Sequence, residues 1–335
     1  MTLYALDAID DALDATRTFL WPFDRGRWAR LALLMLFVGG VGGFNPVQFP
    51  GGSTGGGGVD APAGADGPGA LEAAPSIGGT EVAIIAAIFG VLLLLGLGFL
   101  FVGSVMEFVF VDSLRRETVT IRRYWGEHWS RGLRLFGFRL VLGVVSFALV
   151  GVVLVAAFAP IVFGDGGLSF GLLLAAIPVF AVVTIASGLV NGFTTMFVVP
   201  VMLGEETGVL SAWRRFWPTV TGQWKQYVAY AVMGFVLQLV GGILAGIATL
   251  VGAVVIAIPL GLVALAGAAL LTVVEAAGWA VILVAAVVFG FALIALVLVV
   301  SVPVQTFLRY YALFVLGDTN ETFDLIPDRR RAVRE

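Results

Sequence analysis

Long apolar stretches without a single basic residue divide this chain, and its 19 lysines and arginines fall into four short blocks between them. In chain order the blocks are Arg17, Arg25, Arg27 and Arg30; Arg115, Arg116, Arg122, Arg123, Arg131, Arg134 and Arg139; Arg214, Arg215 and Lys225; and Arg309, Arg329, Arg330, Arg331 and Arg334. Basic side chains beside membrane-spanning segments tend to stay on the cytoplasmic side. The pattern therefore predicts an all-α polytopic membrane helical bundle with six transmembrane helices. It also places the protein in the cell membrane with both termini cytoplasmic.

Composition agrees with a membrane protein and argues against several classes of function. Hydrophobic residues make up 60% of the chain and charged residues only 12%, well below the roughly 25% charged residues of a soluble domain. The net charge of −3 makes nucleic acid an unexpected partner. The chain has no cysteine, and we interpret its one histidine, His128, as an ordinary interfacial residue. Aspartates crowd residues 1–20, so we expect no cleavable signal peptide there.

Six segments are expected to span the membrane, because about 20 apolar residues cover a hydrocarbon core of about 30 Å. Four of them run from Leu31 to about Pro46, Val82 to Val111, Phe136 to Phe163 and Leu168 to Leu203. The stretch from Gln226 to Thr306 is predicted to hold two long helices, broken somewhere between Pro259 and Glu275. Its surplus apolar residues would form a re-entrant or interfacial piece. The Gly/Pro-rich outer loop 45–80 is expected to be a flexible tether.

A tryptophan-centred pattern recurs in the first three basic blocks, at intervals of about 90–105 residues, and predicts an internal repeat. Its copies are Trp21-Pro22 with Trp28, Arg122-Arg123-Tyr124-Trp125, and Arg214-Arg215-Phe216-Trp217-Pro218 with Trp224. The middle copy has Gly132 where the second tryptophan would stand. We divide the membrane domain, residues 1–316, into repeats at 1–112, 113–203 and 204–316. Each repeat is predicted to be an interfacial helix plus a hairpin, and a cytoplasmic tail, 317–335, follows.

Amphipathic helices are predicted within these basic blocks. Leu6, Ile9, Leu13 and Leu20 follow a helical spacing that turns the intervening aspartates away. Tryptophan and arginine at such positions favour a helix lying in the lipid headgroup layer. The alternative is that these faces pack on one another beneath the bundle, and both arrangements can hold at once. The candidate membrane-interface residues are Trp21, Trp28, Arg122, Arg123, Trp125, Trp213, Arg214, Arg215, Trp217 and Trp224.

A polar strip of Ser187, Asn191, Thr194 and Thr195 follows one face of the fourth apolar segment. It is a candidate solute path, but hydrogen bonding between helices is the favoured interpretation because no strip residue carries a charge. Charged residues are absent from the predicted midplane.

Two further patterns concern helix ends and helix packing. Glu107 and Arg309 lie near the cytoplasmic ends of their segments, where they could pair but where extension of each side chain to the interface suffices. The Gly39–Gly43 and Gly242–Gly246 pairs indicate close helix packing.

Several motifs resemble an uncharacterised family of haloarchaeal multi-pass membrane proteins. They are Trp21-Pro22-Phe23-Asp24 with Trp28, Phe44-Asn45-Pro46 before the outer loop, and Leu316-Gly317-Asp318-Thr319 with Phe323-Asp324-Leu325-Ile326-Pro327. More distantly, the repeated interfacial helix and hairpin is similar to the membrane domain attached to some glycerophosphoryl diester phosphodiesterases. The catalytic barrel and metal-binding carboxylates of those enzymes are absent from the chain, so the resemblance does not imply their activity. The resemblance to the haloarchaeal family implies a membrane domain and a halophilic source.

The function predicted from these patterns is that of a non-enzymatic membrane protein, a scaffold or accessory factor. Its expected partners are membrane lipids and other membrane proteins. The alternative is a transporter or channel for a neutral or lipid-like solute that follows the polar strip. No catalytic, cofactor-binding or metal site is assigned.

Overall fold

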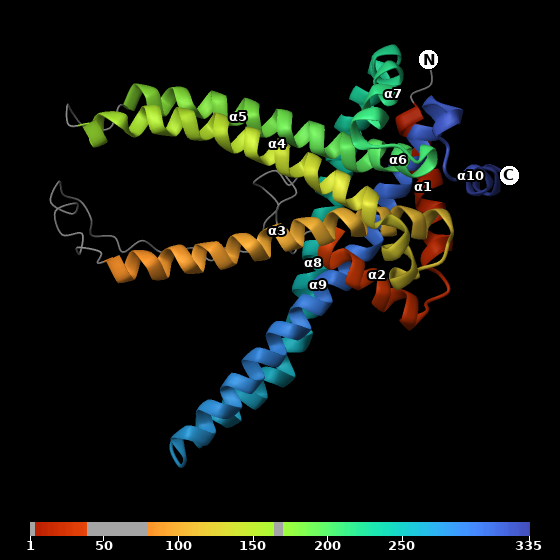
Figure 1. The fold of residues 1–335 in the computed structure, drawn as a ribbon. Helices are drawn as coiled ribbons and strands as arrows, with labels where there is room; N and C mark the ends of the chain where they lie inside the picture. Colours follow the sequence, from red (N-terminus) through yellow and green to blue (C-terminus); the bar gives the residue numbers. More distant parts are fainter. Residues whose placement is uncertain (1–3, 39–78, 164–169) are drawn as a thin grey trace.

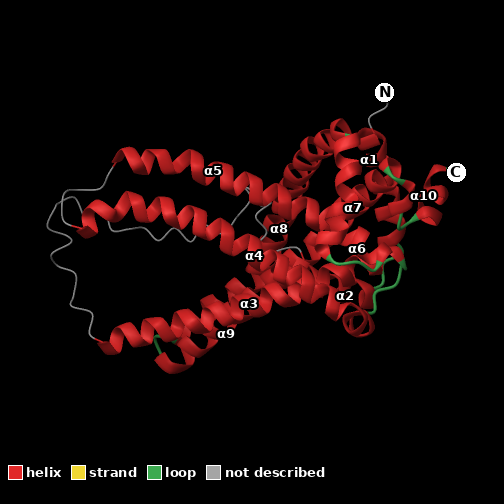
Figure 2. Cartoon of the chain, turned by 45° about the horizontal axis from the view of Figure 1, so that its top comes forward, coloured by secondary structure: helices red, strands yellow, loops and turns green. Residues whose placement is uncertain are grey.

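The computed structural model describes residues 4–38, 79–163 and 170–335, and every regular element in these ranges is helical, as Figure 2 shows. The elements are α1 (Tyr4–Leu20), α2 (Arg25–Val38), α3 (Gly79–Arg115), α4 (Ile121–Phe163), α5 (Phe170–Phe193), a π-helical turn η1 (Thr194–Val198), α6 (Val199–Glu205), α7 (Val209–Gly222), α8 (Trp224–Leu270), α9 (Glu275–Thr319), a 3₁₀ turn η2 (Glu321–Phe323) and α10 (Pro327–Arg334). The all-helical fold class is confirmed for the described residues.

Long apolar arms project from a compact end of the molecule, which we call the base (Figure 1). The base contains α1, α2, α6, α7, η1 and α10 together with the near ends of α3, α4, α8 and α9, packed around one buried apolar cluster. The hairpins α4–α5 and α8–α9 leave it in diverging directions. The sequence predicted a single helical bundle. The arms instead diverge and do not form one bundle along their whole length.

Five helical stretches in the described ranges are long and apolar enough to cross a membrane. They are Gly79–Arg115, Ile121–Ala159, Ala176–Glu205, Trp224–Leu270 and Glu275–Thr319. Their large side chains are exposed, for example Phe147 at 81% and Phe291 at 71%. Exposure of apolar surface to water costs about 25 cal/mol per Å², so these arms require lipid around them. The chain is a multi-pass membrane protein.

Parts of the predicted topology lie outside the described residues. The first predicted span, Leu31 to Pro46, begins in α2 and continues beyond it, so the total of six spans stays a prediction. The outer loop 45–80 and the Gly39–Gly43 pair also fall mainly or wholly outside the described ranges.

The last two spans are the long helices that the sequence predicted. α8 continues through Pro259 to Leu270, and α9 begins at Glu275 after a short turn. The expected re-entrant or interfacial piece is wrong, because the surplus apolar residues simply lengthen the two helices to 47 and 45 residues. At about 1.5 Å per residue each helix is roughly 70 Å long, more than twice the hydrocarbon core. Their near ends therefore lie in the base.

The basic blocks differ in how they join the following span. A connection at Trp21–Asp24 separates α1 from α2, and the single residue Gln223 separates α7 from α8. In the middle block no break occurs, because α4 runs without interruption from Ile121 to Phe163. A basic segment followed by a hairpin is seen for the second and third blocks, as α4–α5 and α8–α9. The first predicted hairpin lies partly outside the described residues, and true internal repetition remains a prediction.

The buried face of α1 differs from the predicted leucine face. Of the predicted residues, Leu20 is buried and Ile9 packs half-buried against the apolar cluster, whereas Leu6 and Leu13 are exposed. The side chains that pack into the base are mainly small and recur every three or four residues, namely Ala5, Ala8, Ala12, Ala15, Thr16, Phe19 and Leu20. Small side chains let the backbone of α1 come close to α9, where the Tyr311 hydroxyl donates to the Ala5 carbonyl oxygen at 2.9 Å. Close backbone approach therefore decides which face of α1 is buried.

Glycines bring α8 and α9 together, but not at the predicted pair. A Cβ added at Gly241 would lie 2.8 Å from a methyl carbon of Val304, and one at Gly252 would lie 2.7 Å from a methyl carbon of Leu296. The Gly242–Gly246 pair has no such neighbour within 4 Å. The interpretation of that pair as a packing motif is wrong, because both residues face away from α9.

Gly132 marks the closest approach of α4 to α3. A Cβ at this position would lie 2.9 Å from the Val105 Cα, a backbone atom that cannot move aside cheaply. This contact explains why the middle block cannot carry the tryptophan found at the corresponding place in the other two.

We predict that Gly132→Ala lowers stability by about 1–3 kcal/mol, the usual cost of overpacking. Gly137→Ala is the matched control on the same helix, since a Cβ there meets nothing within 4 Å. It should raise stability by about 0.5–1 kcal/mol, because glycine is a poor helix former. Thermal unfolding of the two detergent-solubilised variants measures both effects, and equal midpoints would contradict the close α3–α4 approach.

Candidate functional site at the charged base

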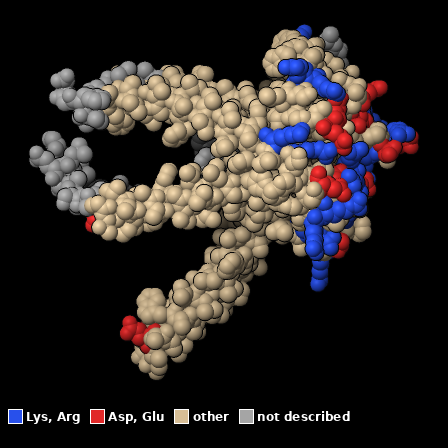
Figure 3. Space-filling view, viewed as in Figure 1, with Lys and Arg blue, Asp and Glu red and all other residues tan. Residues whose placement is uncertain are grey.

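Charged side chains gather at the base, while the arms carry almost none (Figure 3). Two layers of charge can be distinguished. One is buried among the helices and includes Glu107, Asp112 and Arg309. The other is exposed around the base together with several tryptophans. The two layers have different chemical consequences.

The buried layer is centred on Glu107 of α3, which faces arginines from two other helices. The Arg309 guanidinium of α9 donates to one Glu107 carboxylate oxygen through Nη2. Arg139 of α4 donates to the other carboxylate oxygen at 3.3 Å. Glu107 and Arg309 are almost completely buried. Of the two alternatives from the sequence, pairing is therefore confirmed, and extension of each side chain to the interface is wrong, because each satisfies the charge of the other inside the protein.

The π-helical turn η1 completes this group. Arg309 donates from Nη1 to the Thr195 carbonyl oxygen at 2.5 Å, and Arg139 donates to the Thr195 hydroxyl at 2.8 Å. A π-helical turn shifts the helical hydrogen-bond pattern, and here Thr195 offers both its carbonyl and its hydroxyl to arginines. Glu107, Arg139, Thr195 and Arg309, which we call the Glu107 cluster, thus join α3, α4, η1 and α9.

A second buried network surrounds His128, which is not the ordinary interfacial residue that the sequence predicted. Its Nε2 lies 3.0 Å from Asp112 Oδ2, and its Nδ1 lies 3.1 Å from the Arg131 Nη1. Arginine can only donate, so Nδ1 accepts and the Nε2–H donates to Asp112. The imidazole is therefore neutral in this arrangement. Arg116 also bonds Asp112, through Nε at 2.9 Å.

This network contains the three residues whose ligand atoms come close enough for a metal ion. Oxygen or nitrogen atoms of Asp112, Glu127 and His128 lie within 4.8 Å of one another. The donor set does not fit a cation, because Arg116 contacts both carboxylates and Arg123 contacts Glu127 at 2.9 Å. The guanidinium groups already supply the positive charge that a metal would bring. The arrangement is an ion-pair network that joins α3 to α4.

The predicted interface tryptophans divide into two sets. Trp21, Trp217 and Trp224 are 73%, 57% and 56% exposed. Trp28, Trp125 and Trp213 are half-buried, and Trp213 donates its indole N–H to the Thr194 hydroxyl at 3.1 Å. The basic candidates divide in the same way.

Arg122 and Arg214 are exposed and have no ion pair within the part of the chain that the structure describes. Arg123 and Arg215, by contrast, pair with Glu127 and Glu205. The exposed tryptophans and unpaired cations are the groups available to an external partner.

The candidate solute path is mostly occupied by hydrogen bonds between helices. The Ser187 hydroxyl lies 2.6 Å from that of Ser146 on α4. Thr194 accepts from Trp213 of α7, and Thr195 belongs to the Glu107 cluster. Asn191 is buried, and its side-chain oxygen has no hydrogen-bond partner among the described residues. These contacts agree with the favoured interpretation of the strip.

Comparison with known proteins gives one match. The profile of a family described as "Family of unknown function (DUF7544)" matches residues 3–326. No curated protein and no solved structure matches. The match agrees with the expectation of an uncharacterised family, and it supports neither a haloarchaeal source nor the similarity to phosphodiesterase membrane domains.

We predict that Glu107→Ala lowers stability by about 3–5 kcal/mol, because it leaves two buried arginines without a counter-charge. Glu127→Ala is the control: the side chains of its partners Arg123 and Arg116 are 67% and 40% exposed, and exposed pairs contribute only about 0–1 kcal/mol each. Chemical or thermal unfolding of the purified variants gives both values. Equal losses of stability for the two variants would show that the Glu107 cluster contributes no more to the free energy of unfolding than an exposed ion pair does.

Proposed function

We propose that this chain, which belongs to the DUF7544 family of unknown function, is a non-enzymatic membrane scaffold that engages lipid headgroups through the perimeter of its base. Phospholipids are its first partners, and other membrane proteins are further partners that the scaffold organises. No catalytic step, cofactor or metal enters the proposal.

The exposed tryptophans are the observation that carries this proposal. Trp21 precedes α2, Trp217 lies on α7 and Trp224 begins α8, so each stands close to the start of an apolar segment. Indole rings favour the membrane–water interface, where one edge is apolar and the N–H is hydrated. Arg122 and Arg214, exposed and unpaired among the described residues, supply charge for phosphate.

Orientation is part of the same proposal. Basic residues remain on the cytoplasmic side of most membranes, and they gather at the base (Figure 3). We therefore place the base and both termini in the cytoplasm of a cell-membrane protein. The haloarchaeal source, the threefold repeat and the similarity to phosphodiesterase membrane domains remain predictions of the sequence.

The alternative function is transport of a neutral or lipid-like solute along Ser187, Asn191 and Thr194. The observation in its favour is the unsatisfied, buried side-chain oxygen of Asn191, because such groups are rare without a role. Uptake of solutes into proteoliposomes that is lost in Asn191→Leu would favour transport over the scaffold.

We predict that the fluorescence of Trp224 is quenched more by lipids brominated high on the acyl chain than by lipids brominated near the chain end. The reason is that its indole is exposed and that the proposal assigns it to the headgroup level. The measurement uses a variant in which Trp224 is the single tryptophan and phenylalanine replaces the rest.

A variant that retains only the half-buried Trp213 is the control and should be quenched less at both depths, because Thr194 and its neighbours cover the ring. Strongest quenching of Trp224 by deep bromines, or no quenching at either depth, would contradict headgroup contact.

We predict that the outer loop 45–80 and the C-terminus lie on opposite sides of the membrane. Reporters fused after residue 60 should give an external signal, and reporters at the C-terminus a cytoplasmic one. The position after residue 60 lies outside the described residues, in the predicted outer loop. An internal signal from this loop or an external signal from the C-terminus would overturn the proposed orientation.

A further inference from the structure

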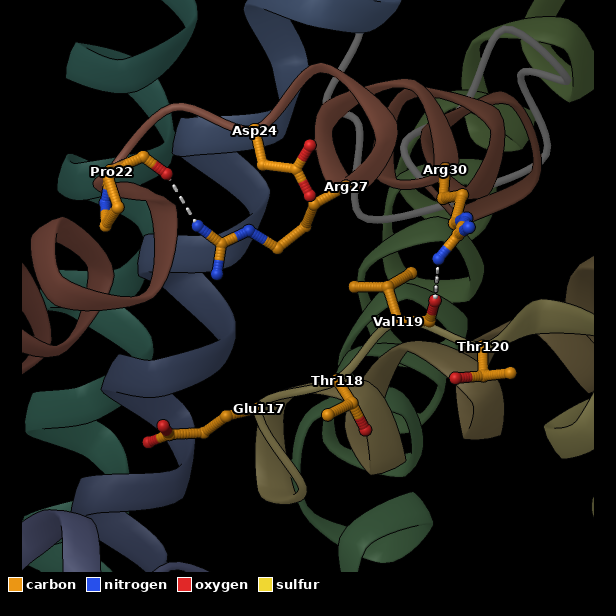
Figure 4. Close-up of a pocket in the computed structure, with 8 residues that line it drawn as sticks. All are labelled: Pro22, Asp24, Arg27, Arg30, Glu117, Thr118, Val119 and Thr120. Atoms are coloured by element: carbon orange, nitrogen blue, oxygen red, sulfur yellow. Dashed lines mark hydrogen bonds between the residues drawn. The ribbon is translucent and has the colours of Figure 1, made fainter.

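A cavity of about 510 Å³ opens at the base between two loops that are far apart in the sequence. One wall is the α1–α2 connection and the first turns of α2, and the other is the connection from α3 to α4 (Figure 4). The lining residues are Pro22, Asp24, Arg27, Arg30, Glu117, Thr118, Val119 and Thr120. Its volume lies in the range of small-ligand sites, about 300–1,000 Å³.

Two arginines of α2 line this cavity: Arg30 extends to the opposite wall, whereas Arg27 extends back to the α1–α2 connection (Figure 4). Arg27 donates to the Pro22 carbonyl oxygen at 2.9 Å, and Arg30 donates to the Val119 carbonyl oxygen at 3.1 Å. Within the described ranges neither has a carboxylate at ion-pair distance. The carbonyls thus hold the side chains in place without neutralising them, and further N–H groups remain for a ligand.

The two carboxylates that line the cavity have partners of their own. Asp24 accepts from the Gly26 backbone N–H at 3.0 Å, close to the start of α2. Glu117 pairs at 3.0 Å with Arg329 of α10. The lining itself holds two arginines and two carboxylates, and Arg329, which pairs with Glu117 from outside the lining, adds a third guanidinium group. The local charge therefore remains positive, although the cavity is not uniformly basic.

Hydrogen-bond donors of several kinds reach the same space. The Nε of Arg27 is buried and has no hydrogen-bond partner in the described structure. Thr118 and Thr120 contribute hydroxyls to the lining, and that of Thr118 also lies 2.8 Å from the Tyr124 hydroxyl, where either oxygen can donate. Thr120 directly precedes α4, and the first N–H groups of a helix have no acceptor within the helix. Guanidinium, hydroxyl and backbone N–H groups together are the donors that phosphate recognition uses.

We propose that this cavity binds a phosphate group, carried by the headgroup of an anionic membrane lipid. The inference rests on the proposed function, because Pro22 and Asp24 lie between Trp21 and Trp28, at the level assigned to the headgroups. Arg27 and Arg30 bind the phosphate oxygens, and the hydroxyls of Thr118 and Thr120 complete the site. Asp24 and Glu117 limit the cavity to ligands that also present a hydrogen-bond donor or a small headgroup.

Native mass spectrometry of the full chain in detergent tests the proposal. The probes are phosphatidic acid, phosphatidylcholine and inorganic phosphate, each added alone, and inorganic phosphate is also added in competition with phosphatidic acid. Phosphatidic acid is expected to remain bound to the wild-type chain, and its affinity should fall at least about tenfold in the double variant Arg27→Gln, Arg30→Gln, a difference of about 1.4 kcal/mol. Phosphatidylcholine should bind more weakly, because its choline group neutralises the headgroup.

Matched controls separate a specific site from general attraction. Arg17→Gln and Arg331→Gln each remove an exposed cation outside the cavity lining and should change phosphatidic acid affinity less than twofold. Arg27→Lys keeps the charge but loses the planar donor set, so it should weaken binding by an intermediate amount. Thr120→Val removes one hydroxyl with little change in volume and should weaken binding without affecting folding.

The outcomes distinguish the source of the phosphate. Displacement of phosphatidic acid by inorganic phosphate supports one shared phosphate site. Binding of inorganic phosphate without lipid retention overturns the lipid assignment, and equal losses in the cavity variants and the two controls overturn the site. Trp224 quenching does not depend on Arg27 or Arg30. If the cavity variants bind phosphatidic acid as well as the wild type but Trp224 is still quenched, the cavity proposal fails and the proposed function stands. If phosphatidic acid binding is lost in those variants but Trp224 is not quenched, the headgroup contact of the base fails and the anion site stands.

Discussion

The arrangement of the helices in the base depends on the buried carboxylate of Glu107. An ionised carboxylate inside a protein is very costly unless positive charge and hydrogen-bond donors surround it. Arg309 and Arg139 provide both, and they come from helices separated from Glu107 by 202 and 32 residues of sequence. Thr195 then satisfies the arginines through its carbonyl and its hydroxyl. Any arrangement that moves α9 or α4 away from α3 leaves charge unpaired in a buried place.

The arms and the base are stabilised in two different environments. The arms depend on lipid, since large side chains such as Phe147 and Phe291 have no protein cover. The base depends on polar contacts and on the packing of small residues, including the alanine face of α1 and the glycine contact of α4. The C-terminal segment belongs to the base as well: Arg334 of α10 bonds Asp318 and Asp11, and the hydrogen bond with Asp318 raises the pKa of its guanidinium. The perimeter where the two environments meet is the place at which headgroups and exposed tryptophans would touch.

The sequence predicted what depends on hydropathy and charge along the chain. Basic blocks located the ends of the spans. The break between Pro259 and Glu275 was predicted because basic flanks on both sides require an even number of crossings and the stretch is too short for four. The alanine face of α1 was missed because hydropathy ranks leucine above alanine, whereas close helix contact favours the smaller side chain. Gly241 and Gly252 were missed because a Gly-x-x-x-Gly spacing does not report which side of α8 faces α9.

Contacts across long sequence separations left little signal. The positions of Glu107 and Arg309 near the cytoplasmic ends of their segments allowed the two to pair but did not require it, and a lone histidine beside Glu127 gave no reason to expect burial. One signal was available: the short α3–α4 connection brings the last turn of α3 beside the first turns of α4, so Asp112 and His128 could have been paired. Distance measurements between spin labels test most directly whether the Glu107 cluster holds the base together. The chain has no cysteine, so labels can be placed at Ser130→Cys on α4 and Glu321→Cys after α9, both exposed. A single narrow distance distribution should broaden in Glu107→Gln, and a distribution that stays narrow would contradict the role of the cluster.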